Sequence, residues 1–450
     1  MYPQSESRSH ALPRLTRREF AGILGSALIL GKSAFGREPV RQLDEPLLNE
    51  IERRAVRYFL EQANPRTGLV KDRCRVTGLE VTQVASIAAT GFGLSALCIA
   101  DKRRFLPHGE GRRRAARALH FLASKAGHER GFFWHFMEAR NGERVWGSEA
   151  SSIDTAWLLC GALHAKAHFN SPAIDRSVQE IVERVDWAWM LDGRDTLSHG
   201  WTPQGGFLPY RWDAYSELMS AYLLAMGSST YPIPGACWDA WQRPVTTEGP
   251  YSFIGCGTPL FTHQYSHAWF DFRGKHDVYA DYFENSRQAT LANRLACIRV
   301  ADEYPWYSQN LWGVTASDSR GGYSGCEKPD GLLVPCAAGG SLPFLPDECT
   351  AVLKHMLERY GSQVWGRYGF IDAFHPGQTW FGPDIIGIDQ GIMLLMAENA
   401  RTGSVWEAFM STPEAQRGME AAGFSSTAPG GGVSRKPNAR SVRSGRSGNL

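Results

Sequence analysis

The chain has 450 residues, of which 43% are hydrophobic and 21% are charged. This composition supports a large packed core and excludes a globally disordered chain. The formal net charge of +2 is close to neutral, which argues against nucleic acid as a partner. Aromatic residues make up 12% of the chain, with 15 Trp beside 47 Gly. Because a buried Trp ring N–H needs a partner, we expect many of these Trp residues to face a binding site.

The N-terminal 36 residues predict an export signal. Paired arginines in Thr-Arg-Arg-Glu-Phe at 16–20 precede a short apolar run at 21–31. This order is typical of a twin-arginine signal, and the run is too short to span a bilayer. Ala34 and Gly36 suit a cleavage site, so the mature chain would begin near Arg37, in a periplasm or outside the cell. The alternative is a basic tail before a short helix.

The C-terminal residues 425–450 consist mainly of Ser, Gly, Pro and Arg. Their lack of apolar side chains predicts a disordered basic tail, which is either solvated or attached to an acidic surface. The nine cysteines show no C-x-x-C spacing of a zinc site, and their odd number argues against a complete disulfide framework. Cys98 and Cys160 lie in apolar helical runs, whereas one disulfide could form among Cys326, Cys336 and Cys349.

The part between these ends, residues 37–424, is predicted to be one all-α domain. Apolar residues at helical spacing begin with Leu47, Ile51 and Ala55 and continue over 82–102, 111–126, 151–169, 174–191, 213–227, 234–243, 277–301, 346–360, 389–401, 404–411 and 413–422. Short hairpins are expected near 131–146. Long loops rich in Gly, Trp, Tyr and Asp intervene at 194–212, 244–259, 304–344 and 365–388. About twelve helices with loops forming a cleft at one end predict a single (α/α)6 barrel; a bundle or two helical domains are the alternatives.

Four segments combine carboxylates with aromatic residues, and the first is 146–157 with Trp146, Glu149 and Asp154. Ser151 or Ser152 would cap the helix that follows. Asp154 would then lie in the first helical turn, where the helix dipole favours a carboxylate. Asp154 is therefore either a helix-start acid or part of a site.

The second segment contains Trp212, Asp213, Tyr215 and Glu217. Asp213 is predicted to cap a helix, which places Glu217 one turn in, among apolar rings. A carboxyl group there has its charged form disfavoured, so its pKa should rise. A raised pKa suits a proton donor at neutral pH. The alternative is an ion pair between Glu217 and Arg211.

The third and fourth segments carry further acids. Trp312 and Asp318 precede a Gly-rich loop at 321–322 that would let a ligand approach closely, although Asp318 could equally cap local backbone. Trp380, Asp384 and Asp389 lie before or at the start of an apolar helix, where Asp389 is either a site residue or merely the N-cap. A capping carboxylate stays ionised, and this state suits a base that activates water.

Two carboxyl groups among aromatic rings, one with a raised pKa and one that stays ionised, are typical of a glycosidase site. The sequence lacks the serine hydrolase elbow, the H-E-x-x-H helix, the P-loop and the dinucleotide fingerprint. His263 and His267 are four residues apart and could share a helix face. Because no third ligand is tied to them, we expect sugar contacts or structural hydrogen bonds, and neither a metal nor another cofactor.

These segments resemble the glucoamylase-like domain family, which includes the bacterial endo-β-1,2-glucanases of glycoside hydrolase family 144 and relatives attached to cyclic β-1,2-glucan synthases. The resemblance covers roughly 45–424. It is carried by Gly-Phe-Phe-Trp-His-Phe at 131–136, Ser-Glu-Ala-Ser-Ser-Ile-Asp-Thr-Ala at 148–156, Tyr-Ser-Glu at 215–217, Pro-Leu-Phe-Thr-His-Gln-Tyr-Ser-His at 259–267, Gly-Val-Thr-Ala-Ser-Asp at 313–318 and Gly-Ile-Asp-Gln-Gly at 387–391. Each motif is weak alone, but their common order is a strong signal.

The resemblance implies an (α/α)6 barrel that acts on β-linked glucans without a metal. Glu217 matches the acid position and is the expected proton donor. Asp389 matches the late acid and is the expected base, acting through water or a substrate hydroxyl, with Asp384 as the alternative. The acids expected to bind sugar or support the site are Glu149, Asp154 and Asp318. The resemblance also places the segment around His263 and His267 in the cleft wall, and both histidines are expected to bind substrate.

We further expect the sugar chain to lie beside Trp146, Trp212, Trp312 and Trp380. Gly147 and Gly340 depart from the usual text of the family, which affects the geometry of the sugar subsites. The function predicted from the sequence is an exported, monomeric, inverting endo-β-1,2-glucanase without a membrane span. The alternatives are a transglycosylase of the same fold and a glucan-binding protein without catalysis.

Overall fold

The computed structural model describes residues 44–78, 82–257, 259–326 and 328–426. The predicted export signal and the predicted tail beyond residue 426 lie outside these ranges. Helices are the main regular structure of the described residues, and the strands among them have only two to four residues each. No helix among them is long and apolar enough to cross a membrane.

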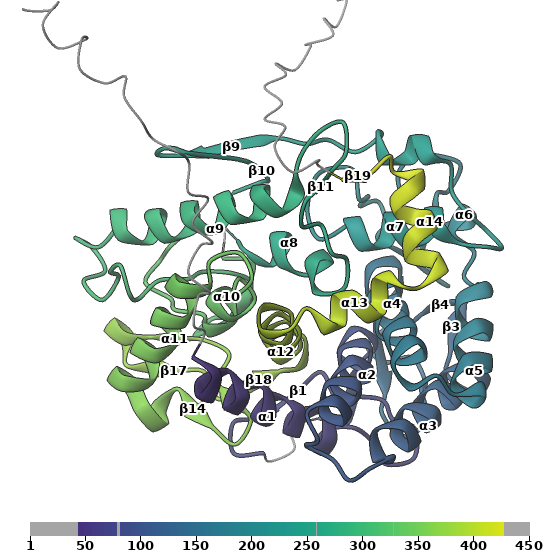
Figure 1. Cartoon of the computed structure of the whole chain (residues 1–450), viewed down its shortest axis with the longest axis horizontal. Coiled ribbons are helices and arrows are strands. Elements are labelled where there is room, and N and C mark those ends of the chain that lie inside the picture. The colour runs from purple at the N-terminus through teal and green to yellow at the C-terminus, as the bar shows by residue number, and fades with distance from the viewer. Residues whose placement is uncertain (1–43, 79–81, 258, 327, 427–450) are drawn as a thin grey trace, which may run out of the picture. The chain divides into compact units, whose positions relative to one another are not determined.

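Four helices are buried on nearly all sides: α2 (Ile87–Lys102), α4 (Ser152–Phe169), α7 (Met219–Gly227) and α12 (Gly387–Arg401). Apolar residues surround much of each helix, and a helix of this kind is stable only inside a core. α2 packs against α4 and α12, and α4 packs against α7. In Figure 1, α12 lies between α1, α2, α10 and α13, all of which it contacts.

A second set of helices buries only one face and covers the first set. These are α1 (Glu45–Glu61), α3 (Glu110–Ser124), α5 (Pro172–Glu183), α9 (Tyr282–Arg299) and α11 (Pro346–Tyr360). In α1 the buried Leu48, Ile51, Ala55 and Phe59 recur at helical spacing, which gives the helix its single apolar face. α1 packs against α12 and α2, and α5 packs against α4. The shorter helices are α6 (Trp187–Met190), α8 (Phe261–Gln264), α10 (Pro335–Gly339), α13 (Ser404–Met410) and α14 (Pro413–Ala421).

Short antiparallel strands lead directly into three of the buried helices. β2 (Val84–Ser86) precedes α2, β6 (Ala150–Ser151) precedes α4, and β18 (Asp384–Ile386) precedes α12. Their partners are β5 (Phe136–Glu138), β7 (Gly200–Thr202) and β1 (Arg73–Arg75), respectively. The other strands are β3 (His128–Glu129), β4 (Phe132–Phe133), β8 (Gly206–Phe207), β9 (Val245–Glu248), β10 (Tyr251–Ile254), β11 (Lys275–His276), β12 (Ser317–Ser319), β13 (Gly322–Ser324), β14 (Trp365–Gly366), β15 (Gly369–Phe370), β16 (Phe374–His375), β17 (Trp380–Phe381) and β19 (Ser425–Ser426).

Helices α2 and α4 approach each other closely where Gly91 meets Gly161. A Cβ atom at Gly161 would lie 2.0 Å from the carbonyl oxygen of Gly91, and one at Gly91 would lie 2.3 Å from that of Trp157. Real Cβ atoms do not approach backbone so closely, so only glycine fits at both positions. This contact fixes the two helices at short range.

Most predicted helices are present, but three differ from the prediction. The helix predicted over 213–227 begins only at Met219, because the backbones of Asp213 and Tyr215 hydrogen-bond with Gln242 instead. Asp213 is therefore an exposed loop residue and not a helix cap. The stretch 174–191 splits into α5 and α6, since the Asp186 side chain caps a new helix start. The stretch 234–243 forms only the 3₁₀ turn η1 (Gly235–Trp238).

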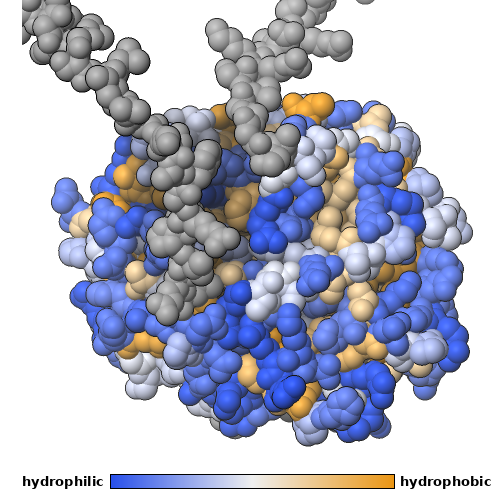
Figure 2. Space-filling model, in the orientation of Figure 1, coloured by the Kyte–Doolittle hydropathy of each residue, from blue (hydrophilic) through white to orange (hydrophobic). Residues whose placement is uncertain are grey.

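Two further expectations need correction. All nine cysteines are free, so the disulfide considered for Cys326, Cys336 and Cys349 is absent. Ser425 and Ser426 form β19, which pairs with β11, so the regular structure extends past the predicted boundary at 424. The face shown in Figure 2 is mainly hydrophilic, with apolar residues scattered between polar ones.

Candidate active site

A pocket of about 420 Å³ lies at the N-terminal ends of the buried helices. Ser86 caps α2, Asp154 lies in the first turn of α4, Glu217 stands just before α7, and Ile388 lies in the first turn of α12; all four line the pocket. Helix N-terminal ends carry partial positive charge, which favours acidic groups there. The remaining lining residues are Asp72, Arg73, His135, Phe136, Ile153, Trp157, Phe261, Tyr265, Tyr323 and Ile386.

Glu217 is held in the turn before α7. Its carbonyl oxygen accepts a hydrogen bond of 2.8 Å from the Ser266 hydroxyl, which in turn accepts the backbone N–H of Ser220. Burial, with a smaller contribution from the charge of Asp154, raises the pKa of Glu217 to about 7. A large fraction of Glu217 is therefore protonated at neutral pH, as a general acid requires.

Asp154 belongs to a cluster with His135 and Glu149. Nδ1 of His135 lies 3.0 Å from Glu149, and Nε2 lies 3.6 Å from Asp154. Burial alone would lower the pKa of His135, but the charges of Asp154 and Glu149 outweigh it and raise that pKa to about 9. Burial also favours the neutral form of Glu149, yet the hydrogen bond from His135 lowers its pKa overall. The imidazole is thus a cation between two acids.

The same three side chains could bring ligand atoms within 4.8 Å of one another, as a metal site would require. However, both ring nitrogens of His135 already face carboxylates. A ring nitrogen binds a metal only when it carries no proton, so this geometry suits a protonated imidazole better than a metal ion. The cluster is therefore an ion-pair network in the pocket wall.

Arg73 links three aspartates on another wall of the pocket. Its guanidinium group binds both carboxylate oxygens of Asp318, at 3.2 and 3.1 Å, and lies 2.9 Å from Asp72. Pairing of β1 with β18 brings Arg75 within 2.9 Å of Asp384. Burial raises the pKa of Asp384, although both arginines partly offset this effect. Asp318 and Asp384 are thus engaged by arginines.

Asp389 lies in the first turn of α12 and is 4% exposed. The N-cap position belongs to Ile386, so the alternative that Asp389 merely caps the helix is excluded. Its Oδ1 atom accepts a hydrogen bond of 3.2 Å from the Tyr265 hydroxyl, and Sγ of Cys336 lies 3.5 Å from the same oxygen. Burial raises the pKa of Asp389 to about 6, with hydrogen bonds opposing the rise. Tyr265 lines the pocket and connects it to Asp389.

Comparison with known proteins identifies the family of the chain. The Glycoamylase family model, described as "Putative glucoamylase", matches residues 209–413. A crystal structure with the same description, from Bacteroides uniformis, shares 30% sequence identity and superposes with a TM-score of 0.81. The match covers 86% of this chain and 99% of the other. The chain belongs to the glucoamylase-like family.

Two further relatives of this glucoamylase-like chain are named glycoside hydrolases. The endo-β-1,2-glucanase of Chitinophaga pinensis, solved with sophorotriose and glucose, is 27% identical with a TM-score of 0.80, over 85% of this chain and 98% of that one. The exo-β-1,2-glucooligosaccharide sophorohydrolase (non-reducing end) of Parabacteroides distasonis is 29% identical over 420 residues, which are 84% of this chain. The chain spans 58% of the length of that protein.

The four tryptophans expected beside the sugar differ in exposure within the glucoamylase-like fold. Trp146 is 70% exposed and packs at 5.1 Å against Phe136 of the pocket wall. Trp380 is partly buried in β17. Trp212 is only 7% exposed, and Trp312 is fully buried. The structure therefore gives no support for direct sugar contact by Trp312, and little for contact by Trp212.

The segment around His263 and His267 lines the pocket through Phe261 and Tyr265, but the two imidazoles themselves lie in the core. They are 1% and 0% exposed, and burial lowers the pKa of each to about 3. His263 hydrogen-bonds with Tyr215, whereas His267 hydrogen-bonds with Ser286. The two imidazoles thus have separate partners and support the core of the glucoamylase-like fold.

Among the polar residues of this site that sequence reasoning missed are Arg73, His135 and Tyr265, which line the pocket, and Asp372, which accepts the backbone N–H of Asp318. His135 and Tyr265 lie inside segments that carried the family resemblance, but no spacing rule singled them out. Asp372 interrupts the apolar run Phe-Ile-Asp-Ala-Phe at 370–374, and an acid in such a run is a recognisable signal of a buried carboxyl group. Arg73 gave no comparable signal, because only Asp72 is its neighbour in the sequence, whereas Asp318 and Asp384 lie far along the chain.

Proposed function

We propose that this chain hydrolyses β-1,2-linked glucan with inversion, using Glu217 as the general acid and Asp389 as the general base. The observation that carries the proposal is the state of Glu217: it lines a pocket with aromatic walls, and burial raises its pKa to about 7. The named activities of the relatives supply the substrate class. Glu149, Asp154 and Asp318 would support the acid or bind sugar hydroxyls.

In the proposed reaction, Glu217 donates its proton to the glycosidic oxygen as the bond from that oxygen to the anomeric carbon breaks. Water attacks the anomeric carbon from the opposite face and loses a proton towards Asp389. The Tyr265 hydroxyl lies between Asp389 and the pocket, so it can pass its own proton to Asp389 and receive one in return. Asp384 is the weaker candidate for the base, because Arg75 holds its carboxylate.

We propose cleavage within the glucan chain rather than release of disaccharide from its end. The chain covers 98% of the endo-acting relative, whereas the exo-acting relative is much longer than this chain. We also propose that the helices close an (α/α)6 barrel, supported by α12 packing against both α2 and α10. Export through the twin-arginine pattern at 16–20 and a monomeric state remain predictions from the sequence.

The decisive test is the substitution Glu217→Gln, which keeps the size of the side chain but removes the acidic proton. We expect kcat on β-1,2-glucan to fall by about 10² to 10⁴-fold, the usual contribution of a general acid. The control is Glu180→Gln on the exposed surface of α5, which should leave kcat unchanged. The wild type would also be assayed on β-1,3-, β-1,4-, β-1,6- and α-glucans to establish which linkage it cleaves.

The products distinguish the alternatives. NMR of the first anomer formed separates inversion from retention, and mixed oligosaccharides separate endo cleavage from disaccharide release. Retention with transfer products would favour a transglycosylase. A wild-type protein that releases no sugar from the panel, yet binds β-1,2-glucan, would favour a glucan-binding protein.

A further inference from the structure

Asp389 shares its buried environment with a second carboxyl group. Asp372 lies between β15 and β16 and is 3% exposed. Asp372 and Asp389 lie within the range of a side-chain hydrogen bond with each other, and each shifts the pKa of the other. A hydrogen bond between two carboxyl groups requires a proton on one of them, because an ionised carboxylate only accepts.

The remaining contacts show that no other group supplies this proton. Oδ2 of Asp372 accepts the backbone N–H of Asp318 at 2.6 Å, and Oδ1 of Asp389 accepts the Tyr265 hydroxyl. Oδ1 of Asp372 and Oδ2 of Asp389 are fully buried, and no N–H or O–H of another described residue reaches them. Buried polar atoms without partners are costly, so a shared proton is the arrangement that satisfies both oxygens.

The surroundings of the two residues indicate which one carries the proton. Asp389 accepts donors from two side chains, Tyr265 and Cys336, and these stabilise its ionised form. Burial and the neighbouring charge of Asp389 raise the pKa of Asp372 well above its usual range. Asp372 is therefore the protonated partner and Asp389 the ionised one.

We propose that Asp372 is a positioning residue for catalysis: it donates the shared proton to Asp389 and so keeps that carboxylate ionised and directed at the Tyr265 hydroxyl. The same side chain also accepts the backbone N–H of Asp318, whose carboxylate binds Arg73 in the pocket wall. Asp372 thus aligns two parts of the pocket. The inference rests on the proposed function, in which Asp389 is the base.

The test compares Asp372→Asn with Asp372→Ala. The Asn amide can donate an N–H to Asp389 while its oxygen still accepts the backbone N–H of Asp318. We expect D372N to keep kcat on β-1,2-glucan within about threefold of the wild type, with the acidic limb of the pH profile nearly unmoved. D372A leaves Asp389 without its donor, so kcat should fall at least about tenfold and the acidic limb should move up by about one pH unit.

A second measurement does not depend on activity. Carboxyl ¹³C NMR at neutral pH should show one protonated aspartic acid in the wild type that is missing from D372N. Wild-type protein that releases no sugar would overturn the proposed function itself. If the wild type is active, a D372N variant with the losses of D372A, or a D372A variant with a wild-type pH profile, overturns the inference. If D372A does not fold, the kcat and pH profile of D372N decide alone.

Discussion

At the scale of single residues, the candidate site places two carboxyl groups in environments that assign them different tasks. Glu217 has few donors around its side chain, and burial raises its pKa to about 7. Asp389 is more deeply buried, but Tyr265 and Cys336 stabilise its charge, and its pKa is about 6. The hydrogen-bond donors therefore lie beside Asp389, the carboxyl group that must be ionised to act as the base.

These two pKa values predict a bell-shaped dependence of kcat/KM on pH. The base is active when ionised, so kcat/KM should fall as pH decreases through about 6. The acid is active when protonated, so kcat/KM should fall as pH increases through about 7. Because kcat/KM reports groups of the free enzyme, initial rates at low substrate concentration give these limbs directly. A rate that keeps rising above about pH 8 would exclude Glu217 as the donor.

Sequence reasoning at this scale found residues whose signal is local. The aromatic neighbours of Glu217 predicted its raised pKa, and Ser151 predicted the position of Asp154 in α4. The roles of Asp372 and Arg73 depend on partners that folding brings from distant segments. Arg73 meets Asp318 across 245 residues, which no spacing rule can anticipate.

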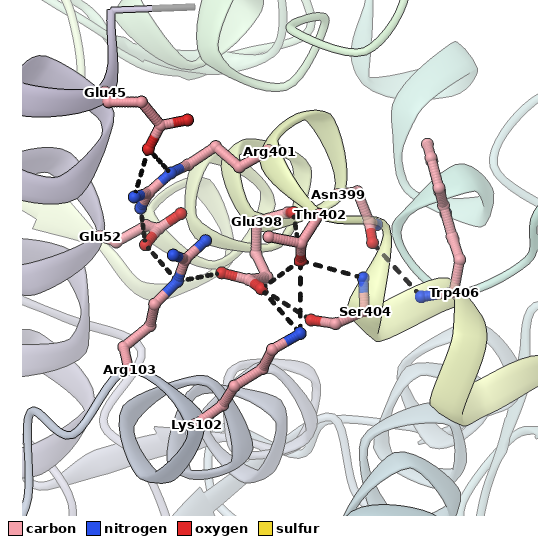
Figure 3. A network of polar contacts seen from close by, with 10 residues as sticks. All are labelled: Glu45, Glu52, Lys102, Arg103, Glu398, Asn399, Arg401, Thr402, Ser404 and Trp406. Atoms are coloured by element: carbon pink, nitrogen blue, oxygen red, sulfur yellow. Dashed lines mark hydrogen bonds and ion pairs between the residues drawn. The ribbon is translucent and has the colours of Figure 1, made fainter.

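At the scale of helices, the pocket and a buried charge network lie at opposite ends of α2 and α12. Figure 3 shows this network at the C-terminal ends, with Lys102 from α2, Arg103 directly after that helix and Arg401 from α12. Arg401 lies 2.5 Å from Glu52 of α1, and Arg103 lies 2.7 Å from Glu398. Both glutamates are fully buried, and cations at helix C-terminal ends are favoured by the dipole. The network therefore ties α1, α2 and α12 together.

The substitution Arg401→Ala should destabilise the fold strongly. It leaves Glu52 buried with Arg103 as its remaining cation, at 3.3 Å, and breaking a buried pair in this way costs about 3–5 kcal/mol. Burial raises the pKa of Glu52 to about 8 even beside Arg401, and the loss of Arg401 raises that pKa further, so the variant keeps Glu52 neutral at a pH where the wild type ionises it. The loss of stability should consequently be larger above about pH 8 than at neutral pH.

The measurement is urea or thermal unfolding of the wild type and of each variant under the same conditions. The matched control is Arg287→Ala, which removes a solvent-accessible pair with Glu284 on α9 and should cost at most about 1 kcal/mol. Folded Arg401→Ala protein should retain glucan hydrolysis, because the network lies away from the pocket. Equal stability of the two variants would show that the network contributes no more than a surface ion pair.

At the scale of the whole molecule, helical periodicity predicted the order of the long helices, since each pattern is contained within one segment. The strands have only two to four residues, too few for a periodic signal, and some pair with distant strands, as β1 does with β18. The high Trp content led us to expect many Trp residues at the binding site, because the sequence does not show which buried partners an indole N–H will meet in the fold. Several indoles are core residues whose ring N–H finds a buried partner, as Trp238 does with Asp277 and Trp269 with Ser95.

The pocket collects residues from Asp72 to Ile388, so a bound glucan would connect segments along most of the folded chain. Glu217→Gln should still bind β-1,2-glucan, because the substitution removes a proton and not the pocket. A ligand that binds only the folded state stabilises it by about 2.7 kcal/mol at a concentration of one hundred times Kd. We therefore expect β-1,2-glucan to raise the Tm of the Glu217→Gln protein, with β-1,4-glucan oligosaccharides as the control that leaves it unchanged. An unchanged Tm at saturating β-1,2-glucan would mean that this glucan is not the ligand of the pocket.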